Sequence, residues 1–130
     1  MIGVDTNVLV RHLTQDDPGQ AAAAGEFFSR ECSGENPAYI NDVVACELVW
    51  VLEDAYAYSR DEIAAVLENL LRTEQVRFAR PSCVWRALEQ YRKSHDFSDA
   101  LIGEINLESG CTAIVTFDRR ASRLTGFRLL

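Results

Sequence analysis

Four acidic residues stand where strands or helices would bring them to one edge of a parallel sheet: Asp5, Glu47, Asp99 and Asp118. Asp5 follows the apolar opening of the chain, and Asp118 follows a β-branched run that ends at Phe117. Ligands of open α/β sheets bind beyond the carboxyl ends of the strands, so these acids are well placed for chemistry. Converging carboxylates bind Mg²⁺ or Mn²⁺, which prefer oxygen ligands and keep several waters. The pattern therefore favours a divalent-metal nuclease.

Glu47 is the most informative of the four acids. Its neighbours three and four residues away are all apolar: Val43, Val44, Trp50 and Val51. Burial of an ionised carboxylate without a partner costs several kcal/mol. We therefore expect Glu47 to bind metal or serve the site. The alternatives are a buried ion pair to an arginine and a helix phase other than the one assumed.

Each of the other acids also has a purely structural interpretation. Asp at a strand end often caps the next helix, which applies to Asp5 and Asp118. Asp99 begins an apolar helix, where the positive end of the helix dipole stabilises an acid. Asp96, three residues earlier, either shares the site or caps that helix.

Metal-activated water requires no side-chain nucleophile. One ion can deprotonate the attacking water while a second, ~4 Å away, stabilises the leaving oxygen of a phosphodiester. Asn7 could orient such a water, and Thr116 shares the side of the strand from which Asp118 projects. The two histidines, His12 and His95, are not at ligand spacing, and we expect both to be surface or capping residues.

The charge of the chain limits its contacts with nucleic acid. The 13 basic and 20 acidic residues give a formal charge of −7, which argues against broad adhesion to polyanions. Bound metal would offset part of that charge. Arginine suits bidentate phosphate recognition, and the candidate phosphate contacts are Arg11, Arg119, Arg120 and Arg123.

Length and composition indicate one domain, residues 1–130, of an ordinary globular protein. The four cysteines are never closer than 14 residues apart, so we expect reduced thiols in or near the core: Cys32, Cys46, Cys83 and Cys111. With no leader pattern and no run of ~18–20 apolar residues, a membrane span is not expected and the cytoplasm is the predicted location.

Strand and helix patterns alternate along the chain, which predicts a parallel sheet covered by helices on both faces. The firmest helix signal is Ser59 with Glu62, at the spacing of a capping box. Predicted strands after the opening one are Ala38–Ile40, Val76–Phe78, Ala113–Thr116 and Phe127–Leu130. Predicted helices are 7–13, capped by Asn7, then 19–32, 42–55, 60–71, 81–94 and 98–109, with a helical turn at 119–124.

Four segments carry a resemblance to a known family: VDTNVLV at 4–10, ELVW at 47–50, DFSDALI at 96–102 and TFDRR at 116–120. In this order they resemble a PIN-domain ribonuclease, specifically the VapC-like toxin of a bacterial type II toxin–antitoxin pair. The resemblance covers the whole chain. Each motif is weak alone, whereas four in sequence are specific.

The resemblance implies a three-layer α/β/α fold around a short, mostly parallel sheet of four or five strands. It also implies Mg²⁺-dependent endoribonuclease activity, a VapB-like antitoxin and a homodimer. The acids named above would bind the metal, with Asn7 and Thr116 as accessory positions. An apolar surface around Leu52, Tyr56 and Tyr58 is the candidate dimer contact, with ordinary core as the alternative.

Two other functions compete with RNA cleavage. Phosphotransfer through an aspartyl phosphate also places Asp at the end of the first strand. Against it, Asn7 stands where a second Asp is wanted, and the single lysine, Lys93, falls on a helix. The other alternative is a non-catalytic module whose acids bind a structural ion or a basic peptide.

Overall fold

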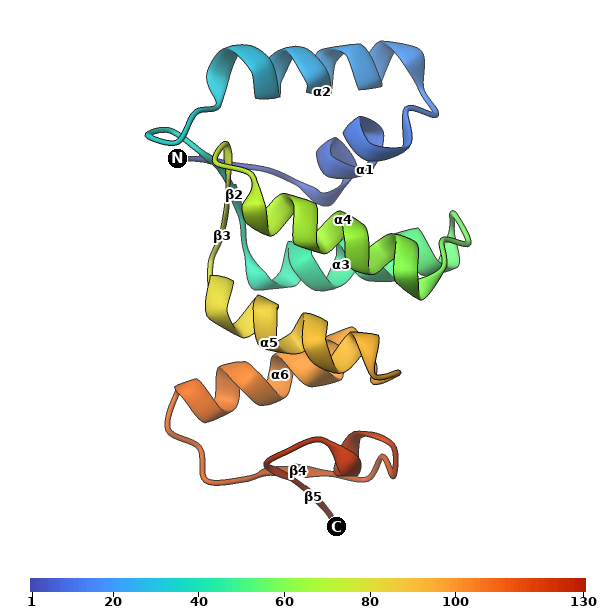
Figure 1. Ribbon diagram of the computed structural model, residues 1–130, viewed down its shortest axis with the longest axis vertical. Coiled ribbons are helices and arrows are strands. Elements are labelled where there is room, and N and C mark those ends of the chain that lie inside the picture. Colours follow the sequence, from blue (N-terminus) through green and yellow to red (C-terminus); the bar gives the residue numbers. More distant parts are fainter.

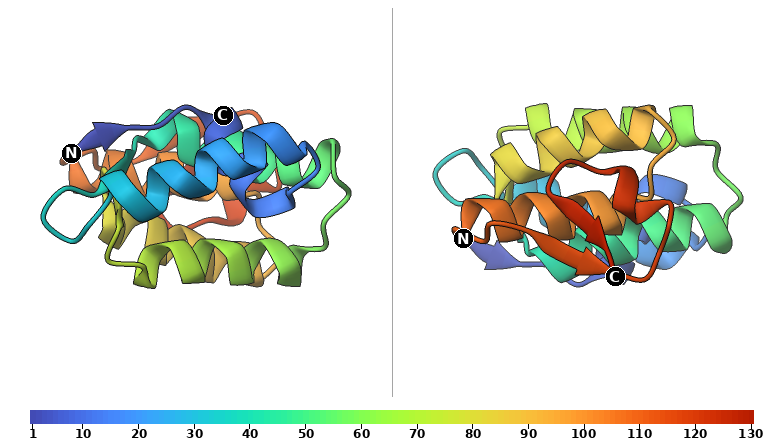
Figure 2. Two further views of the ribbon diagram at one scale, coloured as in Figure 1. Left: turned by 90° about the horizontal axis from the view of Figure 1, so that it is seen from above. Right: turned by 90° about the horizontal axis from the view of Figure 1, so that it is seen from below.

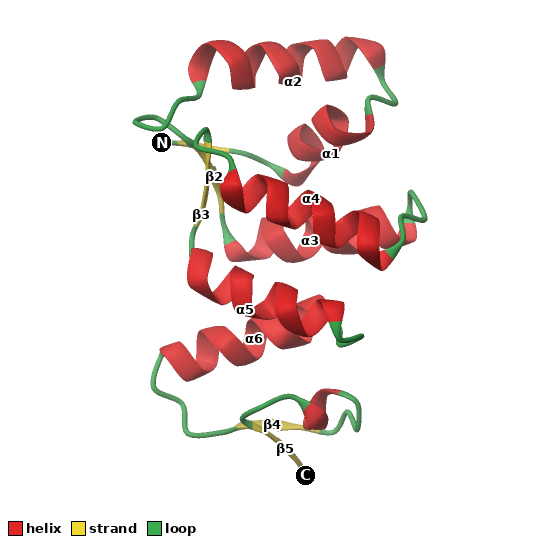
Figure 3. Ribbon diagram, in the orientation of Figure 1, coloured by secondary structure: helices red, strands yellow, loops and turns green.

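The computed structural model describes all residues, 1–130, as an α/β chain with five short strands and six helices. Figure 3 shows how little of the chain is strand and how much is helix. The strands are β1 (Ile2–Gly3), β2 (Ala38–Ile40), β3 (Val76–Phe78), β4 (Ile114–Thr116) and β5 (Phe127–Leu129). The helices are α1 (Thr6–Thr14), α2 (Pro18–Glu31), α3 (Asp42–Asp54), α4 (Arg60–Arg72), α5 (Pro81–Arg92), α6 (Phe97–Glu108) and the 3₁₀ turn η1 (Ala121–Arg123).

Local capping residues set most helix starts. Asp17 accepts a hydrogen bond from the Gln20 amide and precedes Pro18 at the first helical position of α2. The Ser59 capping box of α4 is confirmed. The predicted cap of α1 was wrong by two residues, because the carboxylate of Asp5 accepts from the Thr6 amide and starts the helix before Asn7.

The strands form two sheets, both parallel. One has the order β1-β2-β3, and the other pairs β4 with β5. The predicted five short parallel strands are all present, but they do not form one sheet, because β4 and β5 lie beyond α5 and α6 from the other three (Figure 1). One edge of β1 and one edge of β4 are therefore left unpaired.

Helices cover the three-stranded sheet on both sides, which gives the predicted three-layer α/β/α arrangement. In Figure 1, α1 and α2 lie above the sheet, α3 and α4 lie beside β2 and β3, and α5 lies below them. Seen from below in Figure 2, β4, β5 and η1 lie in front of α6. Phe127 of β5 packs against Gly103 of α6, where no side chain separates the two elements. The carboxyl-terminal strands are therefore attached to α6.

The core corrects two expectations about exposure. Leu52 is fully buried in the main hydrophobic cluster, so it cannot contribute to a dimer surface. All four cysteines are free, and Cys111 is exposed, although a position in or near the core was expected. No helix has both the length and the apolar composition needed to cross a bilayer.

Candidate functional site

A polar pocket of about 720 Å³ brings together three acids that are far apart in sequence. Asp96 and Asp99 come from the start of α6, and Asp118 follows β4. We call this cavity the Asp99 pocket. Its other lining residues are Arg60, Lys93, Ser94, His95, Arg120, Ala121, Arg123 and Leu124.

Asp99 is the acid whose surroundings disfavour its charge most clearly. Burial raises the pKa of this carboxyl, and the negative charges of Asp96 and Asp118 raise it further. Asp96 caps α6, since one of its oxygens accepts from the Asp99 amide at 2.9 Å. A cation in this pocket would relieve the repulsion and favour ionised Asp99.

Asp118 has a capping role as well as a place in the pocket. Its Oδ1 accepts from the amides of Arg120 at 2.8 Å and Ala121 at 3.2 Å, which fixes the chain as it enters η1. Thr116 holds the same turn from the other side, because its Oγ1 accepts from the Asp118 amide at 3.0 Å. One carboxylate oxygen, Oδ2, is left without a protein partner.

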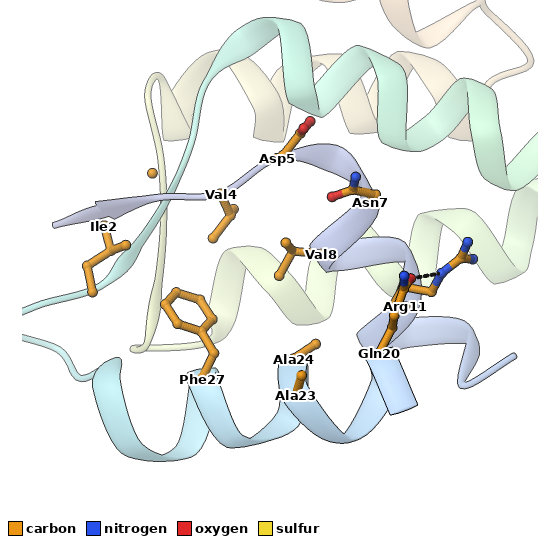
Figure 4. Close-up of a pocket in the computed structure, with 11 residues that line it drawn as sticks. Ile2, Val4, Asp5, Asn7, Val8, Arg11, Gln20, Ala23, Ala24 and Phe27 are labelled. Carbon is orange, nitrogen blue, oxygen red and sulfur yellow. Dashed lines mark hydrogen bonds between the residues drawn. The ribbon is translucent and has the colours of Figure 1, made fainter. Parts of the chain in front are cut away.

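Asp5 lies in a different pocket, between β1, α1 and α2 (Figure 4). This pocket, about 380 Å³ in volume, is also lined by Asn7, Arg11 and the apolar face of α2. In Figure 4 the Asp5 carboxylate points away from Phe27 and Ala24, toward α3. Asp5 and Asn7 therefore do not share a cavity with Asp99.

Glu47 is exposed on α3, so the expectation that it is buried was wrong. Its apolar neighbours Val43 and Trp50 are exposed too, at 67% and 63%. The other two neighbours face inward, since Val44 is buried and Val51 is half-buried, so Glu47 lies outside the buried face of α3 although apolar residues flank it. Glu47 lines neither the Asp99 pocket nor the pocket of Asp5.

Comparison with known proteins shows the family. The sequence profile described as "PIN domain" matches residues 2–126. This chain belongs to the PIN-domain family. The PIN domain is also similar to a VapC ribonuclease of Aquifex aeolicus (strain VF5), at 27% identity over 126 residues that make up 96% of this chain and 92% of that protein. No solved structure gives a significant match.

Of the four arginines predicted to contact phosphate, the structure places two in the Asp99 pocket of this PIN domain, Arg120 and Arg123. Arg119 is exposed outside it. Arg11 is already occupied, because its guanidinium donates to Asp16, to Tyr56 and to Gln20.

Sequence reasoning missed the three other titratable residues of the pocket of the PIN domain: Arg60, Lys93 and His95. Arg60 begins α4 and Lys93 follows the last residue of α5, and no local pattern links them to the acids. The only signal was proximity in sequence, since His95 immediately precedes Asp96. The other histidine, His12, is half-buried against Phe28 at a centroid distance of 4.7 Å and is not a plain surface residue.

The acidic residues have the oxygen donors that a divalent ion prefers, but their side chains are too far apart to hold one. Carboxylate oxygens are the donors that Mg²⁺ and Mn²⁺ prefer. As the side chains lie, however, no group of three or more His, Cys, Asp or Glu residues is close enough to hold a metal ion. Asp96, Asp99 and Asp118 form the best partial set, and Asp5 and Glu47 stand outside it.

Proposed function

We propose that this PIN domain is a VapC-like ribonuclease toxin that cuts RNA internally with Mg²⁺ or Mn²⁺. We further propose that it acts in the cytoplasm and is neutralised by a VapB-like antitoxin. Similarity to the VapC ribonuclease supports the activity. The observation that carries the proposal is that Asp99 and Asp118 share one polar pocket in a chain matched to the PIN family over residues 2–126.

The proposed metal ligands are the four acids of the sequence motifs, with three accessory residues. Divalent metal supplies activation of water and stabilisation of the leaving oxygen. Asp99 supplies a desolvated carboxylate, and Asp118 supplies a free oxygen on a side chain fixed by two backbone amides. The proposed set is Asp5, Glu47, Asp99 and Asp118, with Asn7, Thr116 and Asp96 accessory.

Free strand edges offer a route by which Asp5 could reach the other acids. Asp5 follows β1 and Asp118 follows β4, and each strand has one unpaired edge. Parallel pairing of those edges would put both strand ends on the same side of one sheet. Within one chain α5 and α6 lie between the two sheets (Figure 1), so we propose that metal binding favours this pairing between two copies of the chain.

Hydrogen exchange measured by NMR tests the pairing. Ile2 and Val4 donate to residues in or next to β2, so the amide of Gly3 between them faces the free edge. By the same alternation Val115 faces the free edge of β4, since Ile114 donates to Gly126. Addition of Mg²⁺, which is diamagnetic and leaves the amide signals sharp, should slow exchange at Gly3 and Val115. Unchanged exchange contradicts the proposal. Light scattering on the same samples tests the proposed homodimer, which this pairing requires.

RNA cleavage is tested on purified protein free of any partner. Wild type should cut total cellular RNA in Mg²⁺ or Mn²⁺ and should stop when EDTA is added. Asp99→Asn and Asp5→Asn should abolish cleavage while the fold survives, and Asp54→Asn, at the exposed end of α3, should keep it. Full activity in both site variants would refute the assignment of these acids.

A growth experiment tests the proposed antitoxin. Expression of this protein should arrest growth, and a small protein encoded next to its gene should relieve the arrest.

The aspartyl-phosphate alternative gains no support at Asp5. Lys93, the only lysine, lines the Asp99 pocket, whereas Asp5 lies in the other pocket. A phosphate on Asp5 would therefore lack the ammonium group that such enzymes place beside it.

A further inference from the structure

The Asp99 pocket is basic as well as acidic. Four cationic side chains line it together with the three aspartates: Arg60, Lys93, Arg120 and Arg123. Arg60 and Lys93 come from helices α4 and α5, and the other two come from the segment after β4. The chain carries only 13 basic residues against 20 acidic ones, so this concentration of positive charge is uneven.

None of these four cations has a carboxylate partner. Six other arginines form all eight ion pairs of the chain, which leaves the basic residues of the pocket outside every pair. Four of the seven basic residues that form no ion pair therefore line this one pocket. Their charge is therefore available to an anion from outside the protein.

Arg60 is held in place by the backbone. Its Nη1 donates to the carbonyl oxygens of Tyr91 at 2.9 Å and His95 at 2.8 Å. The guanidinium also lies over the Tyr91 ring, 4.4 Å from the centroid. Arginine has five N–H donors in a planar fork, so those on Nε and Nη2 keep no protein acceptor. Because the side chain is already ordered, an anion that binds it loses little rotamer entropy.

We propose that Arg60 and Lys93 bind a backbone phosphate of the RNA, next to the phosphodiester that reaches Asp99 and Asp118. The inference rests on the proposed ribonuclease function and adds the residues that position its substrate. The arginine fork matches two oxygens of a phosphate or of a carboxylate. The RNA backbone fits better than a single carboxylate, because its neighbouring phosphates can reach Arg120 and Arg123 as well. These four cations would give a chain of charge −7 a local site of attraction for the RNA backbone.

The test is the binding of a fluorescent single-stranded RNA, measured by anisotropy over a range of salt concentrations. All proteins carry Asp99→Asn so that binding is read without cleavage. Arg60→Gln and Lys93→Gln should each weaken binding about 5–10-fold at low salt and reduce the slope of log K against log salt by ~0.7. Arg77→Gln is the matched control, since Arg77 is exposed on β3, has no ion pair and lies outside the pocket.

Lys93→Gln and thermal unfolding of the variants separate a loss of RNA contacts from a loss of folding. Arg60→Gln loses two backbone hydrogen bonds, whereas Lys93 is exposed and its side chain makes no hydrogen bond or ion pair that the change would remove. Arg60→Lys keeps the charge but not the fork, and we expect binding between wild type and Arg60→Gln.

The proposal is overturned if Arg60→Gln and Lys93→Gln bind RNA as Arg77→Gln does, with the same salt slope. It is also overturned if poly-L-glutamate competes as well as RNA at equal charge, which would indicate an acidic protein partner instead. Failure of the ribonuclease proposal gives a different result. Wild type would then cut no RNA in Mg²⁺ or Mn²⁺, whatever the binding data show.

Discussion

Gly103 controls how the β4–β5 sheet attaches to α6, and therefore where Asp118 lies. A Cβ at this position would be 2.5 Å from Cε2 of Phe127 and 3.4 Å from Cζ. Ordinary carbon contacts are about 3.5–4.0 Å, so Gly103→Ala forces the ring to withdraw by roughly 1 Å. The ring belongs to β5, which is paired with β4 along its length. The change should therefore displace the strand that leads into Asp118.

Two opposing effects set the magnitude. Alanine in a helix interior is more stable than glycine by about 1 kcal/mol. Overpacking costs about 1–3 kcal/mol, which leaves Gly103→Ala between neutral and about 2 kcal/mol destabilised. Gly25 is the matched control, because it lies inside α2 and a Cβ there would meet nothing within 4 Å. Gly25→Ala should stabilise the protein by about 1 kcal/mol.

Urea unfolding of both variants measures the difference, which we expect to be about 1–3 kcal/mol. For a chain of this size each kcal/mol moves the unfolding temperature by about 4 °C. Adding Phe127→Leu to Gly103→Ala removes the close ring atoms and should recover stability beyond the sum of the single changes. If Gly103→Ala stabilises as much as Gly25→Ala, the contact with Phe127 does not determine the packing of the two elements.

Two further predictions concern buried groups on α5. The Tyr91 hydroxyl donates to Oε1 of Glu53 at 2.6 Å. Tyr91→Phe should lower the free energy of unfolding in urea by about 1.5 kcal/mol, because water can replace the bond to exposed Glu53. An unchanged unfolding midpoint would show that the bond contributes nothing. Burial, with the hydrogen bond to Glu108 and its negative charge, raises the pKa of Cys83 from 9.0 to about 11. The thiol therefore stays protonated in the folded protein at pH 8.5, and its contribution to stability is complete below pH 9 and lost as the pH rises through about 11. Peptide mapping after iodoacetamide at pH 8.5 should find exposed Cys111 labelled before Cys83. Equal rates of labelling at these two cysteines would contradict the prediction.

The sequence by itself determined most of the helices and strands and the protein family. Helix starts at Pro18 and Arg60 follow from capping side chains one residue earlier, and these bonds join residues at most three positions apart. The order of strands and helices, and the acidic motifs, were likewise sufficient to identify the family. Helix caps and motifs depend only on residues close together in the sequence, so they can be recognised without the tertiary structure.

Only the tertiary structure decided which of these residues share a cavity. It joined Asp99 to Asp118, placed Asp5 in another pocket and exposed Glu47, whose apolar neighbours had suggested burial. It also brought Arg60 within 2.8 Å of the His95 carbonyl, across 35 positions of sequence. Periodicity shows that a helix has an apolar face but not what covers that face, and the division of the strands into two sheets depends on how α5 and α6 pack. Those contacts join distant parts of the chain, and no local pattern encodes them.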